Sequence, residues 1–101
     1  MKIISIGVLR DYWIKRPGSQ QPLQAWVNEV RHAAWTQPAD IKTKFKNASI
    51  LKNRRVVFNI KGNDHRLVVA IAYRHQQVFI KFVGTHEEYD AIDAETVEFK
   101  D

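Results

Sequence analysis

Cysteine is absent from the 101 residues of this chain, which excludes disulfide bonds and thiolate metal sites. Long apolar runs are absent too, because charged residues interrupt the hydrophobic stretches every few positions, so no segment is typical of a transmembrane helix. Arg10 and Asp11 come too early for the apolar stretch of a signal peptide, and no small-residue cleavage site follows. The sequence therefore predicts a cytoplasmic protein with no membrane association.

Acidic residues are scarce over most of the chain. Residues 1–85 carry 15 lysines and arginines minus four aspartates and glutamates, a net charge of +11, whereas residues 86–101 carry one lysine minus seven acidic residues, a net charge of −6. A basic body attracts a polyanion, and the backbone of a nucleic acid is the commonest such partner. The alternative interpretation is a high isoelectric point without any binding role.

The first half of the chain has helical periodicity. No repeat and no linker interrupts the sequence, so we expect a single domain over residues 1–101. A short strand in residues 1–5 and a helix ending at Arg16 precede the breaker Pro17-Gly18-Ser19. A second helix opens at Pro22 and ends at residues 37–40, before a short turn over residues 41–45. Its apolar face is formed by Leu23, Trp26, Val27, Val30 and Ala34.

The second half of the chain changes to the periodicity of strands. Residues 55–61 alternate, with Val56, Phe58 and Ile60 on one side and Arg55, Val57, Asn59 and Lys61 on the other. Residues 66–73 are apolar on both faces, as in a central strand, and residues 78–83 form the next strand. A short helix is predicted over residues 85–92, because Thr85 and Glu88 have the spacing of a capping box.

This order of elements predicts an α+β fold. Two N-terminal helices pack on one face of a small, mainly antiparallel sheet of three or four strands, and a short helix follows it. If Val56, Phe58 and Ile60 face the helices, then Arg55, Asn59 and Lys61 lie on the other face, which we expect to be open.

The densest basic stretch runs from residue 42 to residue 66. Several of its lysines are typical of solvated surface charges, in particular Lys42, Lys44 and Lys46. Arg66 differs, because it begins the most apolar strand, where an unpaired guanidinium is costly. Two hypotheses follow: Arg66 pairs with a carboxylate, or it is kept for a phosphate.

His86, Tyr89 and Asp90 occupy positions i, i+3 and i+4 of the predicted C-terminal helix and share one face of it. A histidine transfers protons near neutral pH, as RNA cleavage through the 2′-hydroxyl requires, and Asp90 is placed to orient its ring. Tyr89 is suited to share a proton or to stack on a base. The alternative is purely structural: Tyr89 packs in the core and His86 only begins the helix.

Other kinds of site are not supported by the residue spacing. The four histidines lack metal-ligand spacing, no glycine-rich loop for a nucleotide is present, and no nucleophile elbow is found. We therefore expect neither a metal nor a cofactor. Trp13, Trp26 and Trp35 lie at or near helical core positions and are interpreted as packing residues.

Three blocks of the sequence resemble the HigB family of type II toxin–antitoxin toxins. They are PADIKTKF (38–45), RRVVFNIKGNDHRLVVAIAY (54–73) and VGTHEEYD (83–90), and their order and spacing match the family. With the helical N-terminus the resemblance covers nearly the whole chain. The motif positions that match are Asn59, Lys61, Asn63, Arg66, His86 and Tyr89.

The resemblance implies a RelE-like fold and a ribosome-dependent endoribonuclease that cleaves translated mRNA and arrests growth. It also implies a HigA-like antitoxin with a helix-turn-helix, through which alone the complex contacts operator DNA. RelE-like toxins vary in the side chains that act as acid and base, so these two roles stay open. We expect His86, Tyr89 and Arg66 to be the catalytic residues. Arg55, Asn59, Lys61, Asn63 and Lys81 are expected to bind RNA.

Two rival functions follow from the same residues. In a non-catalytic RNA- or ribosome-binding module, the basic face binds the RNA backbone, and His86 and Tyr89 are packing residues without a role in chemistry. A DNA-binding role like that of an antitoxin is disfavoured, because strands rather than a third, recognition helix follow the two N-terminal helices.

Overall fold

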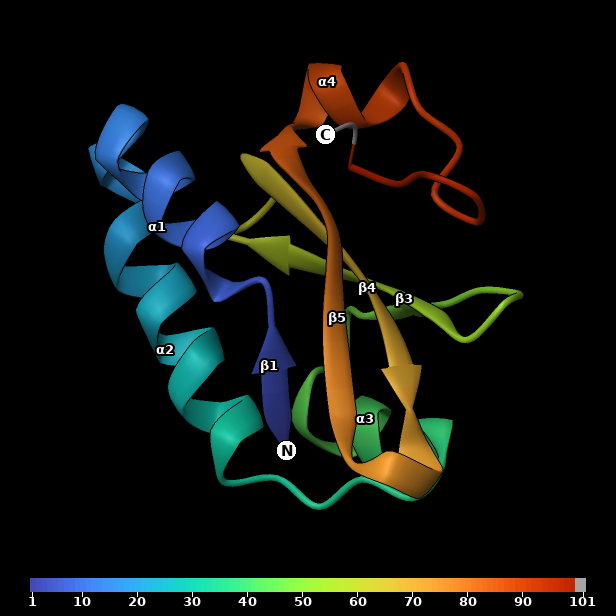
Figure 1. Ribbon diagram of the computed structural model, residues 1–101. Helices are drawn as coiled ribbons and strands as arrows, with labels where there is room; N and C mark the ends of the chain where they lie inside the picture. Colours follow the sequence, from blue (N-terminus) through green and yellow to red (C-terminus); the bar gives the residue numbers. More distant parts are fainter. Residues whose placement is uncertain (100–101) are drawn as a thin grey trace.

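A computed structural model describes residues 1–99 of the chain (Figure 1). The longest helix has 12 residues, and within this range no helix has the length and apolarity needed to cross a bilayer. In chain order the elements are β1 (Lys2–Ile4), α1 (Ile6–Lys15), a 3-10 turn (Pro17–Ser19), α2 (Gln20–Arg31), α3 (Pro38–Lys44), β2 (Ser49–Ile50), β3 (Arg55–Ile60), β4 (His65–Ala72), a second 3-10 turn (Tyr73–His75), β5 (Gln77–Thr85) and α4 (His86–Asp90).

The strands form one mixed sheet in the order β1-β5-β4-β3-β2. The α+β class and the antiparallel β3-β4-β5 meander are confirmed. Within residues 1–99 the sheet has five strands rather than three or four, because β1 adds to β5 in parallel and the two-residue β2 adds to β3. Most of the turn expected over residues 41–45 is instead part of helix α3, which begins at Pro38, a residue favoured in the first turn, and ends at Lys44.

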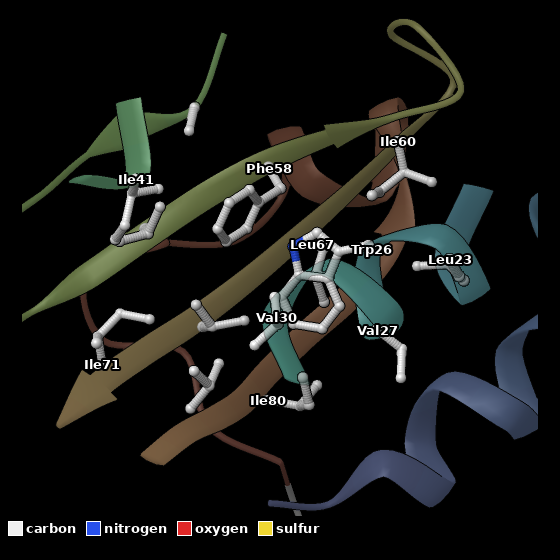
Figure 2. Close-up of a cluster of buried hydrophobic side chains, with 14 of the residues drawn as sticks. Leu23, Trp26, Val27, Val30, Ile41, Phe58, Ile60, Leu67, Ile71 and Ile80 are labelled. Atoms are coloured by element: carbon white, nitrogen blue, oxygen red, sulfur yellow. The ribbon is translucent and has the colours of Figure 1, made fainter. Parts of the chain in front are cut away.

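The main core lies between the sheet and the helices α1 and α2, which run side by side along one face of it (Figure 1). Four of the five residues predicted for the apolar face of this helix are buried there, and Trp26 is only 2% exposed. The fifth, Ala34, is exposed, because α2 ends at Arg31 and not at residues 37–40 as predicted. Figure 2 shows these side chains meeting those of the strands, with Ile41 of α3 at the far end. Trp35 is buried and Trp13 packs at the edge, so the interpretation of the tryptophans as packing residues is confirmed.

The opposite face of the sheet, called here the second face, is partly covered. Residues 91–99, the C-terminal segment, fold back after α4 (Figure 1), and Ala94 packs there against Val57 and Val68. Five partly buried side chains complete this second cluster: Leu51, Phe82, Tyr89, Ile92 and Val97. The prediction of an open second face is therefore wrong for the part beneath the C-terminal segment.

Candidate active site

Arg66 lies on the second face, directly opposite Asn59 of the neighbouring strand β3. Its Nη1 donates hydrogen bonds to the carbonyl oxygens of Asn63, at 2.8 Å, and His65, at 3.4 Å. Its guanidinium carbon stands 5.8 Å from the centre of the Tyr89 ring, a cation–π distance. Within residues 1–99 Arg66 forms no salt bridge with a carboxylate. Of the two hypotheses for this side chain, a carboxylate partner is not found in the described part of the chain.

Helix α4 starts at a fixed residue because Thr85 caps it. The Thr85 hydroxyl accepts a hydrogen bond from the Glu88 amide at 3.2 Å, and the Glu88 carboxylate accepts one from the Thr85 amide at 2.8 Å. This confirms the predicted capping box. The hydrogen bond from the Thr85 backbone, with Arg16 nearby, lowers the pKa of Glu88. The cap therefore determines the direction in which the next side chains of α4 point.

His86 and Asp90 pair along this helix, as their i, i+4 spacing predicts. The imidazole Nδ1 stands 3.3 Å from the Asp90 Oδ2, and the two side chains are 48% and 60% exposed. The His86 amide also donates to the carbonyl of Asp64, which joins α4 to the β3–β4 turn. The ring is thus oriented and open to solvent, as a group that transfers protons to a large substrate must be.

Tyr89 also packs on the second face of the sheet. Its side chain is half-buried and packs against the second cluster, while the guanidinium of Arg66 lies near its ring. The structural alternative for Tyr89 is thus confirmed as far as packing goes, which leaves a role in chemistry open. His86 makes its contact with Asp90 at the surface, outside both hydrophobic clusters.

Arg55 departs from its predicted place on an open face. It is only 6% exposed, because the C-terminal segment folds over it. Its Nη1 donates to the carbonyl of Val97 at 2.6 Å and its Nη2 to the carboxylate of Glu98 at 2.8 Å. In this structure its guanidinium is occupied by the chain itself and is not presented to a ligand.

Lys81 is occupied by the same carboxylate. Its ammonium nitrogen stands 2.7 Å from Glu98 Oε2, and its side chain is 22% exposed. The register of β4 and β5 shifts here, since Val68 pairs with Phe82 and Val69 with Ile80, so that Lys81 falls between the pairs. Hydrogen bonding to Lys81 and the charge of Arg55 lower the pKa of Glu98. Arg55 and Lys81 therefore share the carboxylate of Glu98 and form a basic pair separate from Arg66.

The remaining predicted residues gather around the β3–β4 turn. Lys61 was predicted to be the last residue of the strand, but β3 ends at Ile60 and Lys61 lies in the turn with φ +54°. Its side chain is exposed, and its ammonium nitrogen stands 3.9 Å from Asp64 Oδ2. The Asn59 side-chain amide, also exposed, is 3.4 Å from the Asn63 Oδ1. Because Asn63 also accepts from Arg66, the turn links these polar groups to one another.

One partly buried polar pair close to this turn was not predicted. The hydroxyl of Tyr12 and the Nδ1 of His65 are 2.7 Å apart, with their rings edge to face. Burial is the main cause that lowers the pKa of His65 and raises that of Tyr12. A neutral His65 ring protonated at Nε2 accepts a hydrogen bond from the Tyr12 hydroxyl at Nδ1. This hydrogen bond connects α1 to β4. No sequence pattern reveals it, because the partners are 53 positions apart.

The chain matches a family model described as HigB_toxin, the RelE-like toxic component of a toxin–antitoxin system, over residues 19–92. The chain belongs to the HigB toxin family. An mRNA interferase toxin HigB of Escherichia coli K12 is 30% identical to it over 96 residues, which cover 93% of this chain and 92% of the relative. An mRNA interferase HigB of Escherichia coli O6:H1 is 26% identical over 94 residues, 91% of each chain.

Membership of the HigB family agrees with the resemblance of the three sequence blocks and with the α+β fold. The matched range includes β3, β4, β5 and α4, which carry the residues around Arg66. It ends at residue 92, so Glu98, the partner of Arg55 and Lys81, lies outside it.

Proposed function

We propose that this HigB-family toxin is an endoribonuclease that cleaves translated mRNA on the ribosome, arrests growth, and is neutralised by a HigA-like helix-turn-helix antitoxin. The observation that carries the proposal is Arg66, whose guanidinium is held by backbone carbonyls and the Tyr89 ring. A cation held without a carboxylate partner in residues 1–99 suits a phosphate group. Because the proposed substrate is translated mRNA, the toxin acts in the cytoplasm.

The proposed reaction is attack of an RNA 2′-hydroxyl on the adjacent phosphorus. A base removes the proton of the 2′-oxygen, the new bond to phosphorus forms, and the 5′-oxygen leaves after it takes a proton from an acid. His86, oriented by Asp90, performs one of these two transfers. Tyr89 either performs the other or stacks on a base. Arg66 stabilises the added charge on the five-coordinate phosphate, and the reaction requires no metal.

Dependence on the ribosome is consistent with how open this site is. The side chains of His86 and Asp90 are about half exposed, and Asn59, Lys61 and Asn63 are exposed as well. An open site aligns a flexible RNA poorly by itself, so a second macromolecule that holds the mRNA supplies much of the positioning. The exposed Asn59, Lys61 and Asn63 are proposed to contact the RNA beside Arg66.

The test is to induce the chain alone in bacteria and to map RNA 5′ ends. We expect growth arrest with new ends inside translated regions, and no arrest when the cognate antitoxin is co-expressed. Arg66→Ala is expected to lower cleavage by about 10²-fold or more, the scale of losing one charge-stabilising contact in a transition state. Lys15→Ala, on the exposed end of α1, is the matched control and is expected to cleave normally.

The rival function is a non-catalytic RNA- or ribosome-binding module, favoured by the packing of Tyr89 in the second cluster. The two functions are separated in a translating extract. Intact messages in an extract whose translation the protein has stopped would refute the nuclease and support the binding module.

A further inference from the structure

The sheet has a free edge beside the candidate active site. Strand β2 pairs only with Val56 and Val57, so within the described residues no strand lies beyond the rest of β3, from Phe58 to Ile60. The chain leaves two adjoining hollows along this edge, of about 190 Å³ and about 240 Å³. Both are lined by Phe45 and Asn59, so the two hollows are neighbours.

The smaller hollow combines aromatic, amide and cationic groups. It lies between the α3–β2 loop and the end of β3, and its lining includes Phe45, Lys46, Asn47, Phe58 and Asn59. Single-stranded RNA is bound by groups of these kinds: rings on which a base stacks, amides that bond to its edge, and cations for its phosphates. The larger hollow adds Trp26 and Lys61 to this surface.

The loop that forms the smaller hollow is held in place before any ligand binds. The Phe45 ring packs edge to face on Phe58, with ring centres 5.0 Å apart, and on Trp35, 6.1 Å apart. The Lys42 ammonium donates to the carbonyls of Lys46 and Ala48 at 2.6 and 2.7 Å. A preformed hollow loses little conformational entropy on binding.

Asn47 is the amide left free in this arrangement. This residue is exposed and lines the smaller hollow, and its side chain makes no hydrogen bond to the protein within residues 1–99. A side-chain amide carries both donors and an acceptor, so it can bond to the edge of a nucleobase. Asn59, the second amide of the lining, stands directly across from Arg66 in the β3–β4 register. Asn59 thus lies between the hollow, at the edge of the sheet, and Arg66 on the second face.

We propose that the smaller hollow is a nucleobase subsite, which takes one unstacked base of the RNA next to the phosphate held at Arg66. The base stacks on Phe45, and the amides of Asn47 and Asn59 bond to its edge. Lys46, in the lining of this hollow, and Lys61, in that of the larger hollow beside it, attract the flanking phosphates. This inference rests on the proposed ribonuclease function and adds to it a determinant of where the RNA is cut.

The first experiment compares Asn47→Ala with Asn28→Ala, an exposed asparagine in the separate groove between α1 and α2. Cleavage positions are mapped in a translating extract. We expect the wild type and Asn28→Ala to prefer one base at a fixed position near the cut by about tenfold, the effect of one or two well-placed hydrogen bonds. Asn47→Ala is expected to lose that preference while its thermal midpoint stays unchanged. An Asn47→Ala variant with wild-type base preference would overturn the subsite.

A second experiment does not depend on cleavage. Single-stranded 2′-O-methyl RNA, which cannot react through its 2′-oxygen, is titrated into the labelled protein, and the side-chain amide signals of Asn47 and Asn59 are followed. Base-dependent shifts that disappear with an abasic RNA support the subsite even if the wild type cuts no RNA, an outcome that refutes only the nuclease. Signals that do not move with saturating RNA, or that move only with the antitoxin, would overturn it.

Discussion

Replacing Arg55 with alanine tests whether the C-terminal segment is an integral part of the fold. The change removes the hydrogen bonds to Val97 and Glu98. It also removes the aliphatic part of the Arg55 side chain, a residue that is only 6% exposed. Hydrogen bonds to charged groups contribute about 1.5–3 kcal/mol each where both partners are buried. Glu98 is 57% exposed and regains water when released, so we expect a combined loss of about 2–3 kcal/mol.

Thermal and urea unfolding at neutral pH measure this loss. For a chain of this length 1 kcal/mol corresponds to about 4–8 °C, so the midpoint of Arg55→Ala should fall by about 8–24 °C. Lys61→Ala is the matched control: Lys61 is exposed, its partner Asp64 is 3.9 Å away, and we expect a change within about 0.5 kcal/mol.

The two variants also separate structure from RNA binding. If Arg55→Ala unfolds within about 0.5 kcal/mol of the wild type, the ordinary range for surface positions, the burial of Arg55 by the C-terminal segment contributes no measurable stability. If in addition Arg55→Ala weakens RNA binding as much as Lys61→Ala does, Arg55 belongs to the RNA-binding surface and the reasoning from its burial is refuted.

Further predictions concern chemistry and pH. His86→Ala and Tyr89→Phe should each lower single-turnover cleavage by about 10²-fold or more if they transfer protons, with unchanged unfolding midpoints; a loss of activity in proportion to stability would show that they only pack. The folded-state pKa of Glu98 lies below its ordinary 4.5, so its contribution to stability is present above pH 4.5 and is lost as the pH falls through the lower value. Unfolding measured from pH 3 to 6 should show this slope in the wild type and a weaker one in Glu98→Gln. The pKa of His65 is lowered from 6.5, so stability should decline as the pH falls below about 6.5. Tyr12→Phe should lower the midpoint at pH 8, and an equal effect at pH 5 and pH 8 would mean that protonation leaves the pair intact.

Local patterns in the sequence predicted the central parts of the fold. Alternation of apolar residues located β3, and a capping-box spacing located the start of α4, because both depend on contacts within a few residues along the chain. The two-residue β2 was missed, since a strand of that length has no period to detect. The N-terminal strand was predicted, but its parallel pairing with β5 joins segments more than 70 positions apart and left no local signal.

In the candidate site, too, the features that depend on local spacing could be predicted from the sequence. The His86–Asp90 pair follows from helical spacing and is present as expected, because the geometry of one helical turn determines it. The place of Asn59 opposite Arg66 follows from the antiparallel register once the turn between them is known.

Only the tertiary structure decided what becomes of Arg55 and Lys81. The sequence by itself showed a basic body and an acidic C-terminal end, charges that attract each other. It did not show that the carboxylate of Glu98 would bind the guanidinium of Arg55, 43 positions away in the sequence. Nor did it show that Lys81, at a shift in strand register, would pair with the same carboxylate. Such pairings depend on which surfaces the packed core brings together, and periodicity along the chain contains no record of them.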